Sequence, residues 1–140
     1  MSYHLCKAKS KLNGNWVKGY YVKIEDSETC EELHLIIEPS GTIEKYGYDI
    51  NDYEIIPETL CRCTGIPYGD DFLWEYDIFW DSYEEENAMI EWNNGQFWLA
   101  YQGVVQGADL DAAALYLRRI GNKFDSIRSV NDDSARKICN

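Results

Sequence analysis

Apolar and polar residues alternate along several short stretches of the chain, which is the pattern of half-buried β-strands. The clearest stretch covers residues 71–81, where every second position is aromatic or aliphatic: Phe72, Trp74, Tyr76, Ile78 and Trp80. The intervening positions include Asp71, Glu75 and Asp77. We expect a single strand over 71–81 that buries this aromatic face in the core of a sheet and turns the carboxylates to solvent. An aromatic ligand-binding face is the alternative interpretation.

The N-terminal part of the chain predicts one strand and one hairpin. Residues 16–24 follow the turn signal Asn13-Gly14, and we expect one face of this strand to be buried, the face that carries Trp16, Tyr20, Val22 and Ile24. Residues 33–38 and 42–46 flank a Pro-Ser-Gly turn and predict an antiparallel hairpin over 33–46. The acidic residues 25–32 are then the loop that leads into it.

The C-terminal half contains the strongest turn signal of the sequence. Asn94-Gly95 lies between the strand-like residues 88–92 and 96–101, and both turn residues accept a positive φ, so we expect a hairpin there. The acidic residues 82–87 predict a solvated loop before it. Residues 109–117 fit a short helix, with a final strand over 115–120 as the alternative. The polar residues 131–140 predict a frayed or weakly helical end.

Composition and charge narrow the class of protein. The 140 residues are 45% hydrophobic and include 5 Trp, 11 Tyr and 4 Phe, which is enough apolar material for a packed core. There is no apolar run of about 18 residues and no apolar segment typical of a signal peptide near the N-terminus, so we expect a soluble, cytoplasmic protein.

The net charge of −12 is concentrated in the middle of the chain, where residues 24–91 hold 20 acidic residues against two basic ones. This balance argues against duplex DNA and membrane surfaces as partners. It permits an acidic surface that occupies a basic groove of another protein, with solubility alone as the alternative. The candidate contact charges are Glu25, Asp26, Glu28, Glu31, Glu32, Glu84, Glu85 and Glu86.

No motif assigns a catalytic, cofactor-binding or metal-binding residue. Cys61-Arg62-Cys63 lacks the spacing of a zinc site, and we expect both cysteines to fill the core on one strand face in a reducing compartment. The carboxylates of Asp70, Asp71, Glu75 and Asp77 invite a metal-dependent hydrolase interpretation. No nearby His or Lys completes a catalytic set, so this hypothesis ranks last.

Several segments, taken in order, resemble the YopX family of bacteriophage and prophage proteins. The entry strand NGNWVKGYYV at residues 13–22 is similar to that family's N-G-x-W-V-x-G-Y pattern, and IPETL at 56–60 with CTG at 63–65 is similar to its P-E-T and T-G blocks. Further similar segments are GDDFLWEYDI at 69–78, NGQF at 94–97 and RIGNKF at 119–124. The chain departs from the pattern at Tyr76, where the family has Gly, and at Cys61-Arg62-Cys63, where it has G-Q-Y.

The resemblance implies a mainly β, β-rich α+β fold. It predicts an N-terminal β region over 1–54, an SH3-like small barrel over 55–125 with a short helix near its end, and a C-terminal tail over 126–140. If the barrel forms, its interior is expected to hold Trp74, Trp80, Trp92 and Trp98. The resemblance also implies self-association, and it brings no established activity or catalytic residues.

Three functions follow from these observations. The first is a non-enzymatic phage or prophage accessory protein, a small β-barrel interaction module that forms homo-oligomers and binds a protein partner. The second is an acidic decoy that inhibits a host or defence nucleic-acid-handling protein. The third is the metal-dependent hydrolase. We expect no cofactor, no membrane partner and no duplex DNA.

Overall fold

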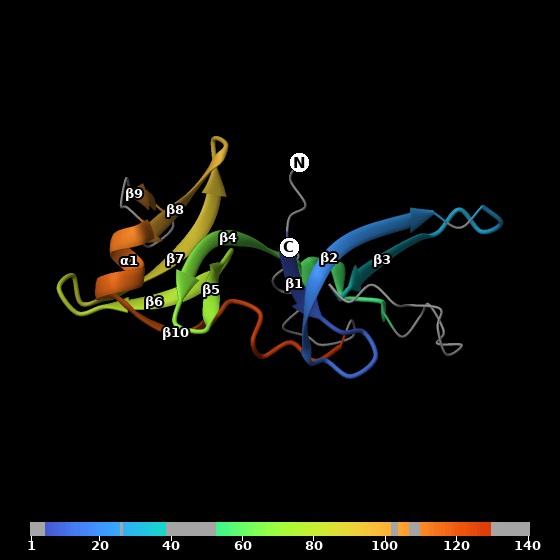
Figure 1. The fold of residues 1–140 in the computed structure, drawn as a ribbon, viewed down its shortest axis with the longest axis horizontal. Helices are drawn as coiled ribbons and strands as arrows, with labels where there is room; N and C mark the ends of the chain where they lie inside the picture. Colours follow the sequence, from blue (N-terminus) through green and yellow to red (C-terminus); the bar gives the residue numbers. More distant parts are fainter. Residues whose placement is uncertain (1–4, 26, 39–52, 102–103, 107–109, 130–140) are drawn as a thin grey trace. The chain divides into compact units, whose positions relative to one another are not determined.

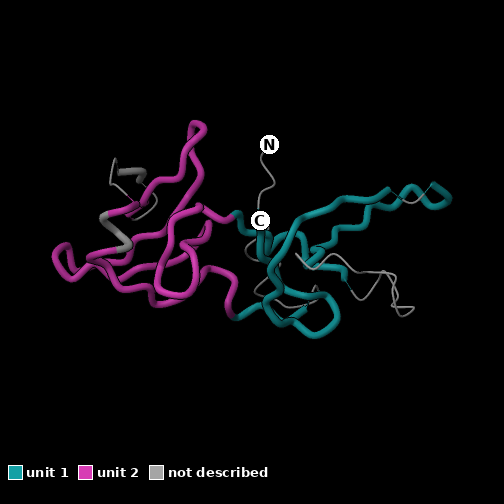
Figure 2. The backbone as a smooth tube through the Cα atoms, in the orientation of Figure 1, with its two compact units in different colours: residues 1–62, 126–140 teal, residues 63–125 magenta. Residues whose placement is uncertain are grey.

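The computed structural model describes residues 5–25, 27–38, 53–101, 104–106 and 110–129, and they fall into two compact units. Unit 1 comprises Met1–Arg62 with Ser126–Asn140, and unit 2 comprises Cys63–Asp125 (Figure 2). The division therefore differs from the expected borders. It lies at residue 62 instead of 54, and the described part of 126–140 belongs to unit 1 instead of forming a separate tail.

The fold is mainly β, as the sequence predicts, and every strand pair is antiparallel (Figure 1). The strands of the described residues form open sheets and not a closed barrel. None of the helices in the described ranges has the length and apolar character needed to cross a membrane. The elements are β1 (Leu5–Lys9), β2 (Trp16–Glu25), β3 (Glu32–Ile37), a 3₁₀ helix (Pro57–Thr59), β4 (Cys61–Tyr68), β5 (Asp71–Trp74), β6 (Asp77–Asp81), β7 (Glu86–Asn93), β8 (Gln96–Tyr101), β9 (Val104–Gln106), α1 (Leu110–Tyr116) and β10 (Arg118–Asn122).

Unit 1 is built on β2, which pairs with β1 on one side and with β3 on the other. The first residues of β4 extend this sheet by pairing with β1. The strand expected over 33–38 is confirmed as β3, which pairs backward with β2, and the acidic residues 26–31 connect these two strands. The hairpin expected over 33–46 stays a prediction. Residues 42–46 lie outside the described part of the chain.

The strand predicted at 16–24 is confirmed, but its buried face is the opposite one. Val17 and Tyr21 pack against the core of unit 1, whereas Tyr20 and Val22 are each 38% exposed. Gly19 lies on the core-facing side between Val17 and Tyr21, and a Cβ atom there would come within 2.2 Å of the Ile37 carbonyl oxygen. Alternation alone does not select the face, because both sides of this strand carry apolar residues.

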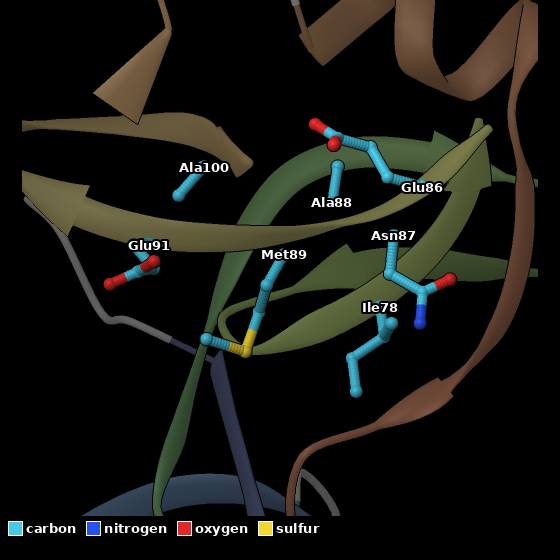
Figure 3. Close-up of a pocket in the computed structure, with 7 residues that line it drawn as sticks. All are labelled: Ile78, Glu86, Asn87, Ala88, Met89, Glu91 and Ala100. Carbon is cyan, nitrogen blue, oxygen red and sulfur yellow. The ribbon is translucent and has the colours of Figure 1, made fainter. Parts of the chain in front are cut away.

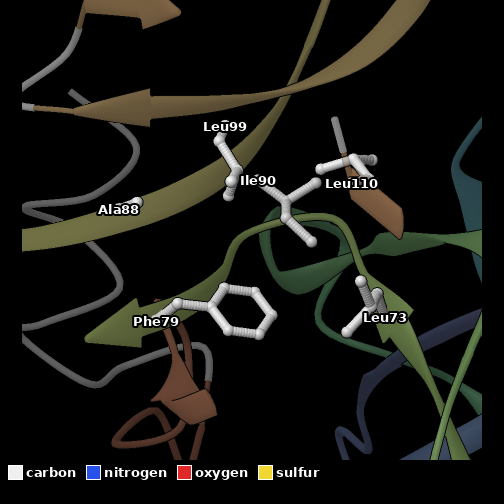
Figure 4. Packing of buried hydrophobic residues seen from close by; sticks show 6 residues of the cluster. All are labelled: Leu73, Phe79, Ala88, Ile90, Leu99 and Leu110. Atoms are coloured by element: carbon white, nitrogen blue, oxygen red, sulfur yellow. The ribbon is translucent and has the colours of Figure 1, made fainter. Parts of the chain in front are cut away.

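Unit 2 contains a five-stranded sheet in the order β10-β6-β7-β8-β9, and the rest of β4 pairs with β5. One face of the sheet holds the core of the unit, which Leu110 of α1 joins (Figure 4). The buried cluster consists of Leu73, Phe79, Ala88, Ile90, Leu99 and Leu110.

The single strand expected over 71–81 is wrong. Glu75 and Tyr76 form a turn between β5 and β6, and Tyr76 has a φ of 69°, outside the extended range of a strand. The buried side is the expected polar side, both before and after this turn: Leu73 and Phe79 are fully buried, and Trp74 is the one fully buried residue of the expected aromatic side. Phe72 and Tyr76 are half-buried, and Trp80 is 37% exposed. Of the four tryptophans expected in the interior, only Trp74 is buried, while Trp92 is exposed and Trp98 half-buried.

The hairpin at Asn94-Gly95 is confirmed as β7 and β8, with both turn residues at positive φ (50° and 81°). The expected acidic loop is confined to residues 82–85, because Glu86 and Asn87 already belong to β7. The region after residue 109 contains both expected elements in succession, since the helix α1 ends at Tyr116 and the strand β10 begins at Arg118.

Candidate interaction surfaces

The sheet of unit 2 has a second face, opposite the core, which strand register defines. Residues paired across antiparallel strands point to the same side, so the rows Ile78–Met89–Ala100, Trp80–Asn87 and Glu91–Trp98 share one face. Arg118 joins this face because it pairs with Trp80. The polar pair Asn93–Gln96 beside the β7–β8 turn lies on the same side. We call the other eight residues the outer face: Ile78, Trp80, Asn87, Met89, Glu91, Trp98, Ala100 and Arg118.

A shallow cavity of about 490 Å³ lies on the outer face. Its apolar side chains are Ile78, Met89 and Ala100, and its polar side chains on that face are Asn87 and Glu91 (Figure 3). Glu86 and Ala88 also line the cavity, but they occupy the alternate positions of β7, and Ala88 belongs to the core. The lining of the cavity is therefore mainly apolar, with polar groups from Asn87, Glu86 and Glu91.

The outer face is nearly free of acidic residues although unit 2 is strongly acidic. Unit 2 contains 12 Asp and Glu against 3 Lys and Arg, a balance of −9 out of the chain's −12. Glu91 is the one carboxylate among the eight outer-face residues, and Arg118 is the one cation. The other acidic residues of unit 2 are not among these eight.

Two carboxylates of unit 2 that lie off the outer face are bound by Arg119. No local sequence pattern indicates this role of Arg119. The Arg119 guanidinium contacts Asp77 Oδ2 and Asp71 Oδ2 at 3.1 Å each, and it donates to the Phe72 carbonyl oxygen at 2.9 Å. Burial by itself lowers the pKa of Arg119, but the hydrogen bond to Asp77 and the charges of both carboxylates outweigh it, so the pKa is raised. The guanidinium also lies 4.8 Å from the centre of the Tyr68 ring.

Asp77 is buried and accepts hydrogen bonds from several residues, so it is not part of a solvent-facing row. Its side chain is 1% exposed, and Oδ2 also accepts the Trp74 backbone N–H at 2.9 Å. Its other oxygen accepts a hydrogen bond from Asn122 Nδ2 at 2.9 Å. Glu75 is also buried, at 4% exposure. The expectation that Asp71, Glu75 and Asp77 face solvent is therefore wrong for Glu75 and Asp77, while Asp71 is half-buried.

The carboxylates proposed for a hydrolase do not converge on a cation site. Asp71 and Asp77 share Arg119, whose positive charge already occupies the space between them. Within the described ranges, no group of three or more His, Cys, Asp or Glu side chains could hold a metal ion. Cys6 and Cys61 are buried, Cys63 is half-buried and Cys30 is exposed.

The acidic residues named as contact charges lie in both units. Glu25, Glu28, Glu31 and Glu32 are exposed at the β2–β3 connection of unit 1, where Glu32 lies 3.7 Å from Lys23. Glu84 and Glu85 are exposed in the β6–β7 turn of unit 2, whereas Glu86 is half-buried in β7. Asp26 lies outside the described residues.

The β6–β7 turn is held by Asp81, another residue that sequence reasoning missed. Asp81 Oδ1 accepts the backbone N–H groups of Tyr83 at 2.9 Å and Glu84 at 3.1 Å, and Oδ2 accepts the Tyr101 hydroxyl at 2.7 Å. The hydrogen bond from Tyr101 is the main reason that the pKa of Asp81 is lowered. An Asp at the start of a turn is a recognisable signal for such backbone bonds, but its partner Tyr101 is 20 residues away.

Comparison with known proteins identified no matching family model, no similar curated protein and no similar solved structure.

Proposed function

We propose that this protein is a non-enzymatic interaction module that self-associates through the outer face of unit 2. The observation that carries the proposal is the apolar, nearly acid-free character of this face within a unit of charge −9. Two copies of an acidic protein repel each other, and they approach at the lowest electrostatic cost where carboxylates are fewest. The outer face also carries one cation, Arg118, and one anion, Glu91, so a second copy can offer each of them an opposite charge.

The side chains of the outer face are those that stabilise an interface. Trp80 is 37% exposed, and Ile78, Met89 and Trp98 are half-buried, so each has apolar surface left to bury. Tryptophan and methionine are enriched in interfaces, and sheets pack face to face through such residues. A stable dimer buries about 800 Å² per partner, so residues next to the outer face are expected to contribute as well.

A phage or prophage accessory role in the cytoplasm of a host bacterium is the biological part of this proposal, and it rests on the resemblance of the sequence to the YopX family. The arrangement of neighbouring genes tests it. Flanking phage genes support the role, and a conserved metabolic operon around the gene would contradict it.

Solution mass tests the self-association directly. Sedimentation equilibrium at tens of micromolar should give a multiple of the 16.3 kDa chain mass. A mass of one chain at that concentration would remove self-association from the proposal.

The acidic decoy is the second candidate, and one observation favours it. Glu84 and Glu85 project from a turn that Asp81 fixes, in the unit that carries most of the negative charge. Fixed carboxylates can imitate phosphates in the basic groove of a nucleic-acid-handling protein, and such binding weakens steeply with salt. Capture from host lysate at low and high salt, with E84Q/E85Q as the comparison, tests it. Salt-insensitive capture, or equal capture by the variant, would exclude the decoy.

A further inference from the structure

The most exposed large apolar side chains of the described residues all lie in unit 2. They are Tyr83 at 91% exposure, Tyr116 at 82% and Leu115 at 76%. Large apolar side chains on a protein surface are common singly, but a group of them marks a site of interaction. The outer face includes none of these three residues, so they are not explained by the proposed self-association surface.

Strand register brings these residues to one end of the sheet. Arg118 pairs with Trp80, and the two strands run in opposite directions. Tyr116 therefore precedes β10 at the end of the sheet where Tyr83 follows β6, and Figure 1 shows the end of α1 meeting β10 at that end. Tyr83, Leu115 and Tyr116 form what we call the apolar tip.

The apolar tip is fixed on the side of Tyr83. Asp81 is 7% exposed, and its carboxylate binds the backbone N–H groups of both Tyr83 and Glu84. The Tyr101 hydroxyl donates a hydrogen bond to the other oxygen of that carboxylate, Oδ2. An aromatic side chain on a turn that is already ordered loses little backbone entropy on binding, which favours affinity.

The charges beside the apolar tip are two carboxylates on the side of Tyr83 and one exposed cation, Arg118, two residues after Tyr116, so the balance is acidic. Glu84 and Glu85 follow Tyr83 directly, and both are exposed. We propose that the apolar tip inserts its tyrosines into an apolar groove of a different protein, and that lysine and arginine side chains rim this groove. Tyrosine is among the residues that carry most of the energy of an interface, and carboxylates at the rim steer a basic partner.

Other occupants fit the tip less well. A second copy of the chain would bring its own acidic turn against Glu84 and Glu85, and like charges oppose this. An anionic membrane surface would repel the same carboxylates. A decoy that imitates nucleic acid relies on the carboxylates, so it does not require the tyrosines.

A designed peptide can stand in for the unidentified partner. The probe is a fluorescent 14-residue helix of leucine and lysine whose leucine face is bordered by lysines. Its first control replaces leucine with serine at equal charge, and its second replaces lysine with glutamate. Fluorescence anisotropy at physiological salt measures binding to the full-length protein, to Y83S/Y116S, to E84Q/E85Q, and to L12S, which changes an exposed leucine of unit 1.

We expect the leucine–lysine helix to bind the wild-type protein and L12S equally, and Y83S/Y116S about tenfold more weakly. Both control peptides should bind more weakly than the probe.

Equal binding of the probe to wild type and Y83S/Y116S would overturn the proposal, as would binding that only E84Q/E85Q weakens. Binding to neutral phosphatidylcholine vesicles that Y83S/Y116S abolishes would assign the tip to membranes and also overturn it. Thermal unfolding of each variant confirms that it is folded. Self-association has its own test, so the two proposals can fail separately.

Discussion

The hydroxyl of Tyr101 donates a 2.7 Å hydrogen bond to Asp81 Oδ2, and this bond joins the end of β8 to the end of β6 across the intervening strand β7. Burial and the negative charge of Asp81 raise the pKa of Tyr101 from 10.0 to about 12. The same bond lowers the pKa of Asp81. The pair is therefore most stable with Asp81 ionised and Tyr101 protonated, which is its state at neutral pH.

Replacing Tyr101 with phenylalanine should reduce the free energy of unfolding at pH 7 by roughly 1.5–3 kcal/mol, the range for a hydrogen bond to a charged group. The folded-state pKa of Tyr101 is raised, so its contribution is complete below pH 10 and is lost as the pH rises from 10 to about 12. The difference between wild type and Y101F in urea unfolding should therefore shrink over that range.

The same comparison of wild type and Y101F can be extended to acidic pH, where Asp81 becomes protonated. Its folded-state pKa is lowered, so its contribution is present above its ordinary pKa of 3.8 and is lost as the pH falls through the folded-state value. A difference between wild type and Y101F that stays constant from pH 7 to pH 12 would contradict the assignment of the bond.

Arg119→Met should destabilise the protein by about 3 kcal/mol, the lower end of the range for breaking a buried ion pair. The reason is that Asp77, with 1% of its side chain exposed, would keep a buried charge without its guanidinium partner. Arg118→Met is the matched control, because Arg118 is the exposed neighbour of Arg119 and should change stability by less than about 0.5 kcal/mol. Equal effects of the two substitutions in urea unfolding would show that the Arg119 network contributes nothing.

Gly19→Ala should cost roughly 3 kcal/mol, the upper end of the range for overpacking, because the new Cβ would meet the backbone of Ile37 at 2.2 Å. A backbone atom cannot move aside as a flexible side chain can. Lys23→Ala in the same strand removes only an exposed ion pair and should cost less than about 1 kcal/mol. Thermal unfolding distinguishes the two, and a stable G19A would place residues 17–21 in a different register.

The sequence predicts those elements whose signal is local. Asn94-Gly95 identifies its hairpin because two adjacent residues determine the turn, and the succession of α1 and β10 follows from a change of periodicity over a few residues. The single strand predicted over 71–81 is wrong because Tyr76 adopts a positive φ, which is not expected for a tyrosine. The choice of face was also wrong, because Leu73 before the turn and Phe79 after it both belong to the core, on the side that was predicted to be polar.

The parts of the candidate sites that depend on distant pairs are not predictable from local pattern. Arg119 reaches Asp71 across 48 positions of sequence, and Tyr101 reaches Asp81 across 20. The outer face could not be predicted either. It combines Ile78 and Trp80 of the predicted aromatic side with Met89 of β7 and Ala100 of β8, and only the register of β6, β7 and β8 brings them together.

The measurement that tests the central claim most directly is sedimentation equilibrium of wild type, Met89→Glu and Leu12→Glu at equal concentration. Met89 lies in the middle of the outer face, and Leu12 is an equally apolar residue in unit 1 that is 67% exposed. We predict a multiple of the chain mass for wild type and L12E, and the mass of one chain for M89E, because a carboxylate in the apolar centre cannot be buried without a partner. An oligomer that M89E leaves intact would contradict self-association through the outer face.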